Sequence, residues 1–185
     1  MKLASSLLMV IGCMCTPLWA CGPDPQRVIE QVDITASPAQ VAQALQHAEW
    51  MPRWHPQVQT VSIHTSITGT AEGAPETVRS LQLRNGWTLQ ETLRKHADAA
   101  VLEDSFMQGG SFPVSQYRGV IRLKVAPDQQ HVTVTWTGRF NNQANQMEAP
   151  PGQDNATAVA GITAFYRSGL QGLKVFVETQ AMASP

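Results

Sequence analysis

The sequence has few cysteines and little net charge, and these shortages exclude several classes of protein. Only three cysteines occur among 185 residues, and Cys13 and Cys15 lie in an N-terminal segment that resembles a leader. The chain after that segment keeps Cys21 alone, which excludes a disulfide within it. The formal net charge of -1 and the pI near 6.5 give no basic footprint for nucleic acid and no polybasic tract for anionic lipid. Composition therefore predicts neither partner.

The sequence also lacks the patterns that mark metal, nucleotide and hydrolase sites. No pair of histidines has the close spacing of a zinc or iron site, no glycine-rich phosphate loop follows a strand, and no nucleophile elbow occurs. The five histidines are scattered: His47, His55, His64, His96 and His131. We therefore predict no metal and no cofactor, and we assign no catalytic residue.

The N-terminal segment has the form of a secretory signal peptide. Lys2 precedes an apolar run that ends at Ala20, which is too short to favour a spanning helix. The motif Leu18-Trp19-Ala20-Cys21 resembles a bacterial lipobox, in which Cys21 would be lipidated. Ordinary cleavage after Ala20, leaving a free thiol, is the alternative. We expect a periplasmic protein, either soluble or anchored to the membrane through Cys21.

The remaining chain is long enough for one domain with a substantial core and too short for two. We predict a signal peptide over residues 1–20, a proline-containing tether over 21–26, one domain over 27–180 and a short tail over 181–185. The domain opens with a strand from Val28 to Ile34. Ser37-Pro38-Ala39-Gln40 then predicts a capping box and a short helix, and a second short helix follows near residues 49–56.

A period of two begins at residue 57 and predicts several strands. Asn85-Gly86 marks a hairpin, and a three-residue loop with Gly86 left-handed gives the better register. That register pairs Leu81 with Leu89 and places Arg79 opposite Glu91 as a cross-strand ion pair. Further strands are predicted near residues 57–65, 100–106, 117–125 and 132–140, with a loop over 108–113.

Residues 155–180 predict a long amphipathic helix, capped by Asp154 or Asn155. One strip of this helix carries Gly161, Gly169 and Gly172, which predicts either close packing or one wall of a cavity. An antiparallel sheet with one apolar face needs a cover, and this helix is the candidate. The fold class is α+β: a helix-grip domain in which about seven antiparallel strands wrap around the C-terminal helix, with two short helices after the first strand.

This order of elements, with Val28 to Ile34 followed by Ser37-Pro38-Ala39-Gln40-Val41, resembles the START-like, Bet v 1-like superfamily that includes polyketide cyclases and dehydrases. A further likeness is to the MxaD-type periplasmic accessory proteins of methanol oxidation. It rests on Gly22-Pro23, on Trp54-His55-Pro56, and on Phe112-Pro113-Val114 followed by Tyr117. Ala42 departs from the tryptophan that many relatives have there. The resemblance implies a cavity, and an accessory role beside a methanol dehydrogenase system rather than catalysis.

The residues expected to line the cavity are mostly aromatic. They are Trp54, His55, Trp87, Glu91, Tyr117, Trp136, Phe140, Phe165, Gly169 and Phe176. These rings either surround a pocket or fill the core, and both interpretations stay open. His55 either orients a ligand or caps the short helix, with Trp54 plugging the end of the core. Glu91 is either a buried acid with a raised pKa or a structural partner of Arg79 near the rim.

Two binding or catalytic functions follow from these observations, beside a purely structural envelope lipoprotein, which Cys21 and a solid core would fit. The first is an exported, non-enzymatic accessory protein that binds a hydrophobic small molecule, a periplasmic redox protein, or both. The second is a cyclase or dehydratase acting on a small carbonyl compound, with His55 or Glu91 as base and Tyr117 as acid.

Overall fold

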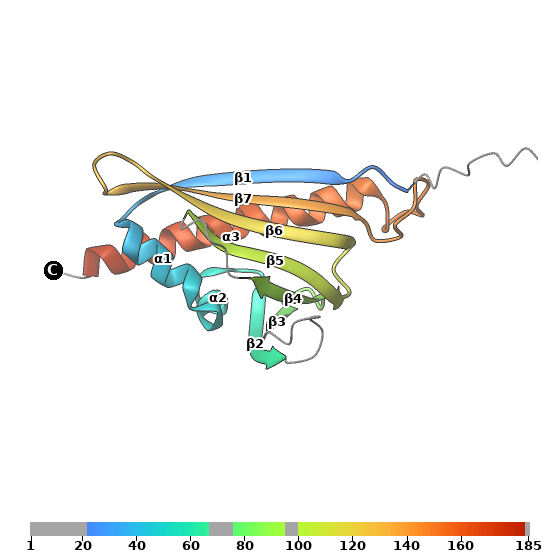
Figure 1. The fold of residues 1–185 in the computed structure, drawn as a ribbon, viewed down its shortest axis with the longest axis horizontal. Helices are drawn as coiled ribbons and strands as arrows, with labels where there is room; N and C mark the ends of the chain where they lie inside the picture. The colour runs from blue at the N-terminus through green and yellow to red at the C-terminus, as the bar shows by residue number, and fades with distance from the viewer. Residues whose placement is uncertain (1–21, 67–75, 95–99, 184–185) are drawn as a thin grey trace, which may run out of the picture.

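The computed structural model describes residues 22–66, 76–94 and 100–183. Seven antiparallel strands form one sheet in the order β1-β7-β6-β5-β4-β3-β2. The strands are β1 (Gln26–Thr35), β2 (Val58–Ser66), β3 (Glu76–Leu83), β4 (Thr88–Arg94), β5 (Val101–Gly110), β6 (Val114–Val125) and β7 (His131–Asn142). The helices are α1 (Pro38–Gln46), a 3-10 turn η1 (Ala48–Trp50), α2 (Met51–Trp54) and α3 (Asn155–Ala183). Helix α3 lies along the sheet, with α1 and α2 beside its C-terminal half (Figure 1). The predicted helix-grip fold is confirmed.

Side-chain caps fix where the helices begin. The Ser37 hydroxyl accepts from the Gln40 amide, and the Gln40 side chain accepts from the Ser37 amide, so the predicted capping box is present. Asp154 Oδ1 accepts from the Thr157 amide at 2.8 Å and caps α3. Helix α3 then continues to Ala183, which is three residues beyond its expected end at residue 180.

The β3–β4 hairpin has the register that the sequence predicts. Gly86 has a φ of +88°, and the Leu83 amide donates to the Trp87 carbonyl at 2.8 Å. Leu81 therefore pairs with Leu89, and Arg79 pairs with Glu91. This pairing decides where the charged side chains of the interior lie.

The predicted loop over residues 108–113 is partly wrong, because β5 continues to Gly110. The reason is a register shift between Gln90 and Glu91 that lets Gly109 and Gly110 continue the pairing with β4. Gly110 has a φ of +125°, and a Cβ atom there would meet the backbone of Thr88. Glycine is therefore required where the strand ends.

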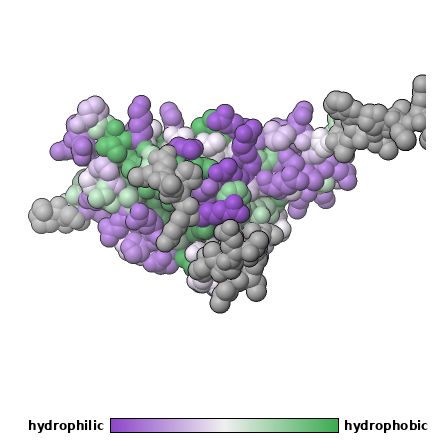
Figure 2. Space-filling model, viewed as in Figure 1, coloured by the Kyte–Doolittle hydropathy of each residue, from purple (hydrophilic) through white to green (hydrophobic). Residues whose placement is uncertain are grey.

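The core lies between the concave face of the sheet and α3, and α2 closes one end. A Cβ atom on Gly169 would lie 2.6 Å from the His55 ring, and one on Gly172 would overlap the Trp54 carbonyl. The glycine strip is thus a site of close packing. Gly169 and Gly172 pack against residues 54–56 at the end of α2, Gly169 also approaches Trp136 of β7, and Gly161 approaches Pro113. Hydrophilic residues predominate on the face shown in Figure 2. No helix in the described part of the chain is long and apolar enough to cross a membrane. The predicted signal peptide and Cys21 lie outside the described residues.

Candidate functional site

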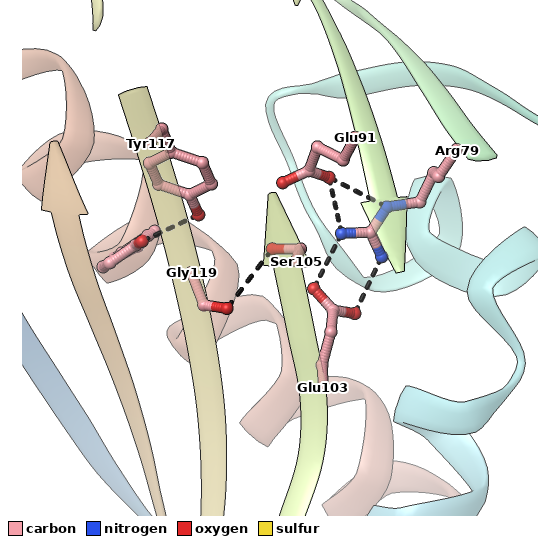
Figure 3. Close-up of polar contacts among 7 residues, drawn as sticks. Arg79, Glu91, Glu103, Ser105, Tyr117 and Gly119 are labelled. Atoms are coloured by element: carbon pink, nitrogen blue, oxygen red, sulfur yellow. Dashed lines mark hydrogen bonds and ion pairs between the residues drawn. The ribbon is translucent and has the colours of Figure 1, made fainter. Parts of the chain in front are cut away.

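An ionic cluster lies in the interior, where three neighbouring strands place Arg79, Glu91 and Glu103 side by side (Figure 3). The Arg79 guanidinium donates to Glu91 Oε2 from Nη2 at 2.7 Å and from Nε at 3.0 Å. It also donates to both oxygens of Glu103, at 2.7 and 2.8 Å. All three residues are buried, at 1%, 2% and 8% exposure. The predicted pair is therefore present, but it lies inside the protein and not near the rim.

The cluster holds two carboxyl groups against one guanidinium, so it is negative by one charge when both are ionised. Burial raises the pKa of Glu91, and the negative charge of Glu103 adds to this effect; Arg79 and the Ser105 hydroxyl oppose it. Burial alone would lower the pKa of Arg79, but the two carboxyl groups outweigh it and the pKa rises. Arg79 therefore stays charged, and Glu91 is a carboxyl group that takes up a proton readily.

Two tyrosines extend the polar interior beside this cluster. The hydroxyls of Tyr117 on β6 and Tyr166 on α3 form a hydrogen bond of 2.8 Å, and both side chains are buried. Burial raises the pKa of each tyrosine, and the charge on Glu91 raises it further, so both hydroxyls stay neutral. A Cβ atom on Gly119 would overlap the Tyr117 side chain, and one on Gly138 would lie 2.5 Å from the Tyr166 hydroxyl. The two inward glycines therefore make room for the phenol rings.

His55 is fully buried where α2 ends. Its backbone amide donates to the Met51 carbonyl at 2.7 Å, and its Nδ1 accepts from the Gln57 amide at 3.3 Å. Burial, with a further contribution from Arg79, lowers the pKa of His55 from 6.5 to about 3; the Phe165 carbonyl opposes this shift without completing a hydrogen bond. The imidazole is therefore neutral at ordinary pH, and it ends the short helix while Trp54 fills the end of the core.

Three ring nitrogens near His55 have no hydrogen-bond partner within the described residues. They are Trp54 Nε1, His55 Nε2 and Trp136 Nε1. The rings are neighbours, with centroids 5.6 Å apart for Trp54 and His55 and 6.2 Å apart for His55 and Trp136. Each buried group without a partner costs about 1–3 kcal/mol. A hydrogen-bond acceptor, such as a carbonyl oxygen, would therefore be stabilised at this end of the core, where it could accept from these nitrogens.

Aromatic rings occupy the space between the sheet and α3. Phe165 lies 4.1 Å from His55, 5.5 Å from Phe112 and 5.6 Å from Trp136, measured between ring centroids. Trp136 also stacks on Tyr166 at 4.3 Å. The rings are therefore packed against one another in this state of the molecule.

The structure brings most of the expected cavity residues together, in two groups. Trp54, His55, Trp136, Phe165 and Gly169 surround the unpartnered nitrogens, and Glu91 and Tyr117 belong to the polar cluster. The other three lie elsewhere: Phe140 is buried in the core, half-buried Trp87 packs on Phe112, and Phe176 turns toward Trp50.

Sequence reasoning missed Glu103, Ser105 and Tyr166 as members of the polar interior. Glu103 and Ser105 alternate along β5, so a period-two assignment of an inner face to residues 100–106 would have pointed both inward. Tyr166 stands at helical spacing from the apolar residues Ile162 and Leu170 of α3, and nothing in the sequence indicates its partner. Within the described residues, no group of histidine, cysteine, aspartate and glutamate side chains is arranged to hold a metal ion.

A wide groove lies on the surface between α2 and α3, with a volume of about 800 Å³. Its described lining is Arg53, Trp54, Pro56, Ser168, Gln171, Gly172, Val175, Phe176, Thr179 and Gln180. Val175 is an aliphatic side chain that is 57% exposed. Arg53 is the one charged residue among these, and its guanidinium lies 5.1 Å from the Trp50 ring and 5.4 Å from the Phe176 ring. The groove combines an apolar floor with a cation at its edge.

Comparison with known proteins identifies the family. Residues 25–178 match the family model described as polyketide cyclase / dehydrase and lipid transport. No curated protein sequence matches the chain. Among solved structures, the protein XoxI from Bacillus cereus is 23% identical, with a TM-score of 0.63 over 82% of this chain and 94% of that one.

Two further solved structures share the fold. A START superfamily protein from Mycobacterium smegmatis is 12% identical, with a TM-score of 0.60 over 83% of this chain and 98% of that one. The ZhuI aromatase/cyclase from Streptomyces sp. R1128 is 16% identical, with a TM-score of 0.62 over 84% and 94% of the two chains. The START-like, Bet v 1-like resemblance is thereby confirmed, and this chain belongs to the polyketide cyclase / dehydrase and lipid transport family.

Proposed function

We propose that this protein is an exported, non-enzymatic accessory protein that binds a hydrophobic small molecule in the groove between α2 and α3. The observation that carries this proposal is the groove itself, whose volume of about 800 Å³ lies within the usual range for ligand sites. Its walls are largely apolar, and the exposed Val175 and half-buried Phe176 form part of them. Burial of such side chains by a ligand is favourable, because apolar surface leaves water.

The packing of the interior supports a site on the surface. Phe165 and Tyr166 of α3 pack against Trp136 of β7, so a ligand could enter the interior only by displacing rings from a densely packed core. The groove requires no such rearrangement. The family description also includes lipid transport, which agrees with an apolar ligand.

The finer parts of the proposal rest on the sequence. The signal peptide form of residues 1–20 supports a periplasmic location, and Cys21 supports a membrane anchor. The MxaD-type likeness supports a periplasmic redox partner, such as a methanol dehydrogenase system, that would receive the bound molecule or be assisted by the protein. Isolation of the protein from its own periplasm with such a dehydrogenase attached would support this partner.

The groove is tested by titration with an environment-sensitive apolar dye. Val175→Glu places a charge on the apolar wall, and because Val175 is exposed, the change leaves the core intact. We expect the dye to bind the natural protein and to bind Val175→Glu at least tenfold more weakly. Val125→Glu is the matched control, since Val125 is a 40% exposed valine at the end of β6 and does not line the groove. Equal dye binding by Val175→Glu and Val125→Glu would show that the groove is not the binding site.

A cyclase or dehydratase acting on a small carbonyl compound is a second candidate, and the unpartnered nitrogens of Trp54, His55 and Trp136 favour it. A carbonyl oxygen among them would accept hydrogen bonds that the protein itself leaves unmade, while Glu91 and Tyr117 lie in the adjoining polar interior. This candidate requires the aromatic packing to open. It predicts that Glu91→Gln abolishes turnover of a carbonyl substrate without unfolding the protein, and unchanged turnover would exclude Glu91 as the base.

A further inference from the structure

The convex face of the sheet carries four arginines that come from three strands, β1, β6 and β7. Arg27 on β1 pairs with Arg139 on β7, which in turn pairs with Arg118 on β6, so three arginines form a row across adjacent strands. Arg122 lies four residues after Arg118 on β6, and because side chains alternate along a strand, both point to the same face. The four side chains surround a shallow hollow of about 260 Å³, together with Val120 and Thr137.

This face is positively charged beyond what the protein neutralises. Asp104 accepts two hydrogen bonds from Arg118, both at 2.9 Å. No ion pair within the described residues joins Arg27, Arg122 or Arg139 to an acid, and all three are exposed. Four arginines and one aspartate leave three positive charges at the hollow. Like charges directly opposite each other destabilise a sheet, so the row has a cost that Asp104 offsets only at Arg118.

The chemistry of the hollow selects a phosphate-type oxyanion. A guanidinium donates two parallel hydrogen bonds to phosphate, and several of them around one hollow satisfy its oxygens from different sides. The hollow is too small for a hydrophobic ligand and lies on the opposite face of the sheet from α3. It is therefore separate from the groove between α2 and α3.

The position of the chain's N-terminal part indicates where such phosphates come from. Arg27 is the second residue of β1, and only five residues separate it from Cys21. A span of six residues reaches at most about 20 Å when extended. The predicted anchor at Cys21 would therefore hold the arginine face within that distance of a bilayer surface. The four arginines do not form a polybasic tract in the sequence. They come together only when the sheet places three strands side by side.

We infer that the convex face formed by Arg27, Arg118, Arg122 and Arg139 binds the phosphate headgroups of anionic phospholipids. Each basic residue near an anionic membrane contributes about fivefold to binding, which corresponds to about 1 kcal/mol. The face thus turns the sheet toward the membrane and leaves the groove between α2 and α3 open on the other side.

The test is co-sedimentation of the chain from Gly22 onward, which contains every core residue described above, with lipid vesicles. This chain has no Cys21, so an acyl anchor cannot contribute. We expect binding to vesicles that contain phosphatidylglycerol and not to vesicles of phosphatidylcholine alone, with binding weakened by salt. The double variant Arg27→Gln, Arg139→Gln should bind about 25-fold more weakly. Arg84→Gln, which removes one charge at the β3–β4 hairpin, should bind as the natural chain does.

Several results would overturn the inference. If the double variant still binds phosphatidylglycerol vesicles, the membrane contact lies elsewhere on the protein. If the natural chain binds no vesicles, the arginine face does not bind lipid, and an acidic protein surface becomes its expected partner. Complete competition by millimolar inorganic phosphate would assign the hollow to free phosphate and not to a headgroup. Thermal unfolding of the double variant checks the fold, and we expect no loss of stability because a like-charge contact is removed.

Discussion

Replacement of His55 tests the physical basis of the buried interior through the pH dependence of stability. The pKa of His55 is about 3 in the folded protein and 6.5 when the ring is solvated. The unfolded chain therefore binds the proton that the folded chain rejects, and the imidazole destabilises the fold progressively as pH falls below 6.5. Between pH 6.5 and pH 5 the difference is about 1.5 units, which corresponds to about 2 kcal/mol.

The variant His55→Asn isolates this effect. The asparagine oxygen can accept the hydrogen bond that His55 Nδ1 accepts from the Gln57 amide, but it does not titrate. Urea unfolding at pH 7 and pH 5 should show that the variant, although less stable at pH 7 because it is smaller, loses about 2 kcal/mol less on acidification than the natural protein does. His64→Asn, at an exposed position on β2, is the control. An unchanged pH dependence in His55→Asn would refute the assignment of a buried, neutral imidazole.

Three other substitutions test the interior and its packing. Glu91→Gln should weaken the loss of stability on raising the pH. Because the pKa of Glu91 is raised in the folded protein, the stability that its protonation contributes is fully present below pH 4.5 and is lost as pH rises through the folded pKa. Urea unfolding should therefore show that the variant loses less stability than the natural protein as pH rises above 4.5. Arg79→Met leaves two buried carboxyl groups without their cation and should lower the free energy of unfolding by about 3–5 kcal/mol. The triple variant Arg79→Met, Glu91→Gln, Glu103→Gln should recover much of this loss, because no buried charge is left unpaired. No recovery would contradict the ionic account. Gly172→Ala should lower stability by about 1–2 kcal/mol although alanine favours a helix by about 1 kcal/mol, because its Cβ meets the Trp54 carbonyl, and a rise in the melting temperature would contradict this packing.

Local signals predicted the fold well because each one has a single geometric solution. The Ser37 capping box fixes where α1 begins after β1, and Gly86 with its left-handed φ fixes the β3–β4 register. That register was enough to predict the Arg79 and Glu91 pair from the sequence. Their depth was not predictable, because it depends on α2 and α3 closing over the sheet.

The rest of the site could not be predicted, because it is assembled from distant strands. Glu103 reaches Arg79 across two strand pairings, and the hydroxyl of Tyr166 meets Tyr117 only when α3 packs on the sheet. The arginine row has the same origin, since Arg27 and Arg139 are 112 residues apart in the chain and meet only through the pairing of β1 with β7. Patterns of short period carry no information on such contacts.

The glycines of α3 illustrate how an open alternative is resolved. The sequence predicted either close packing or a cavity wall, and the packing of Gly169 and Gly172 against residues 54–56 selects close packing for this strip. The same contact makes α2 part of the floor of the groove, since Trp54 and Pro56 line it. A feature that seemed to weaken the helix thus positions the proposed ligand site.

The central claim, a hydrophobic ligand in the groove between α2 and α3, is tested most directly by native mass spectrometry of the protein purified gently from its own cell envelope. The account predicts a discrete excess mass that disappears on denaturation, that is retained by Val125→Glu and that is absent from Val175→Glu. The same excess mass in all three proteins would place the ligand in the interior, and no excess mass in the natural protein would contradict the claim.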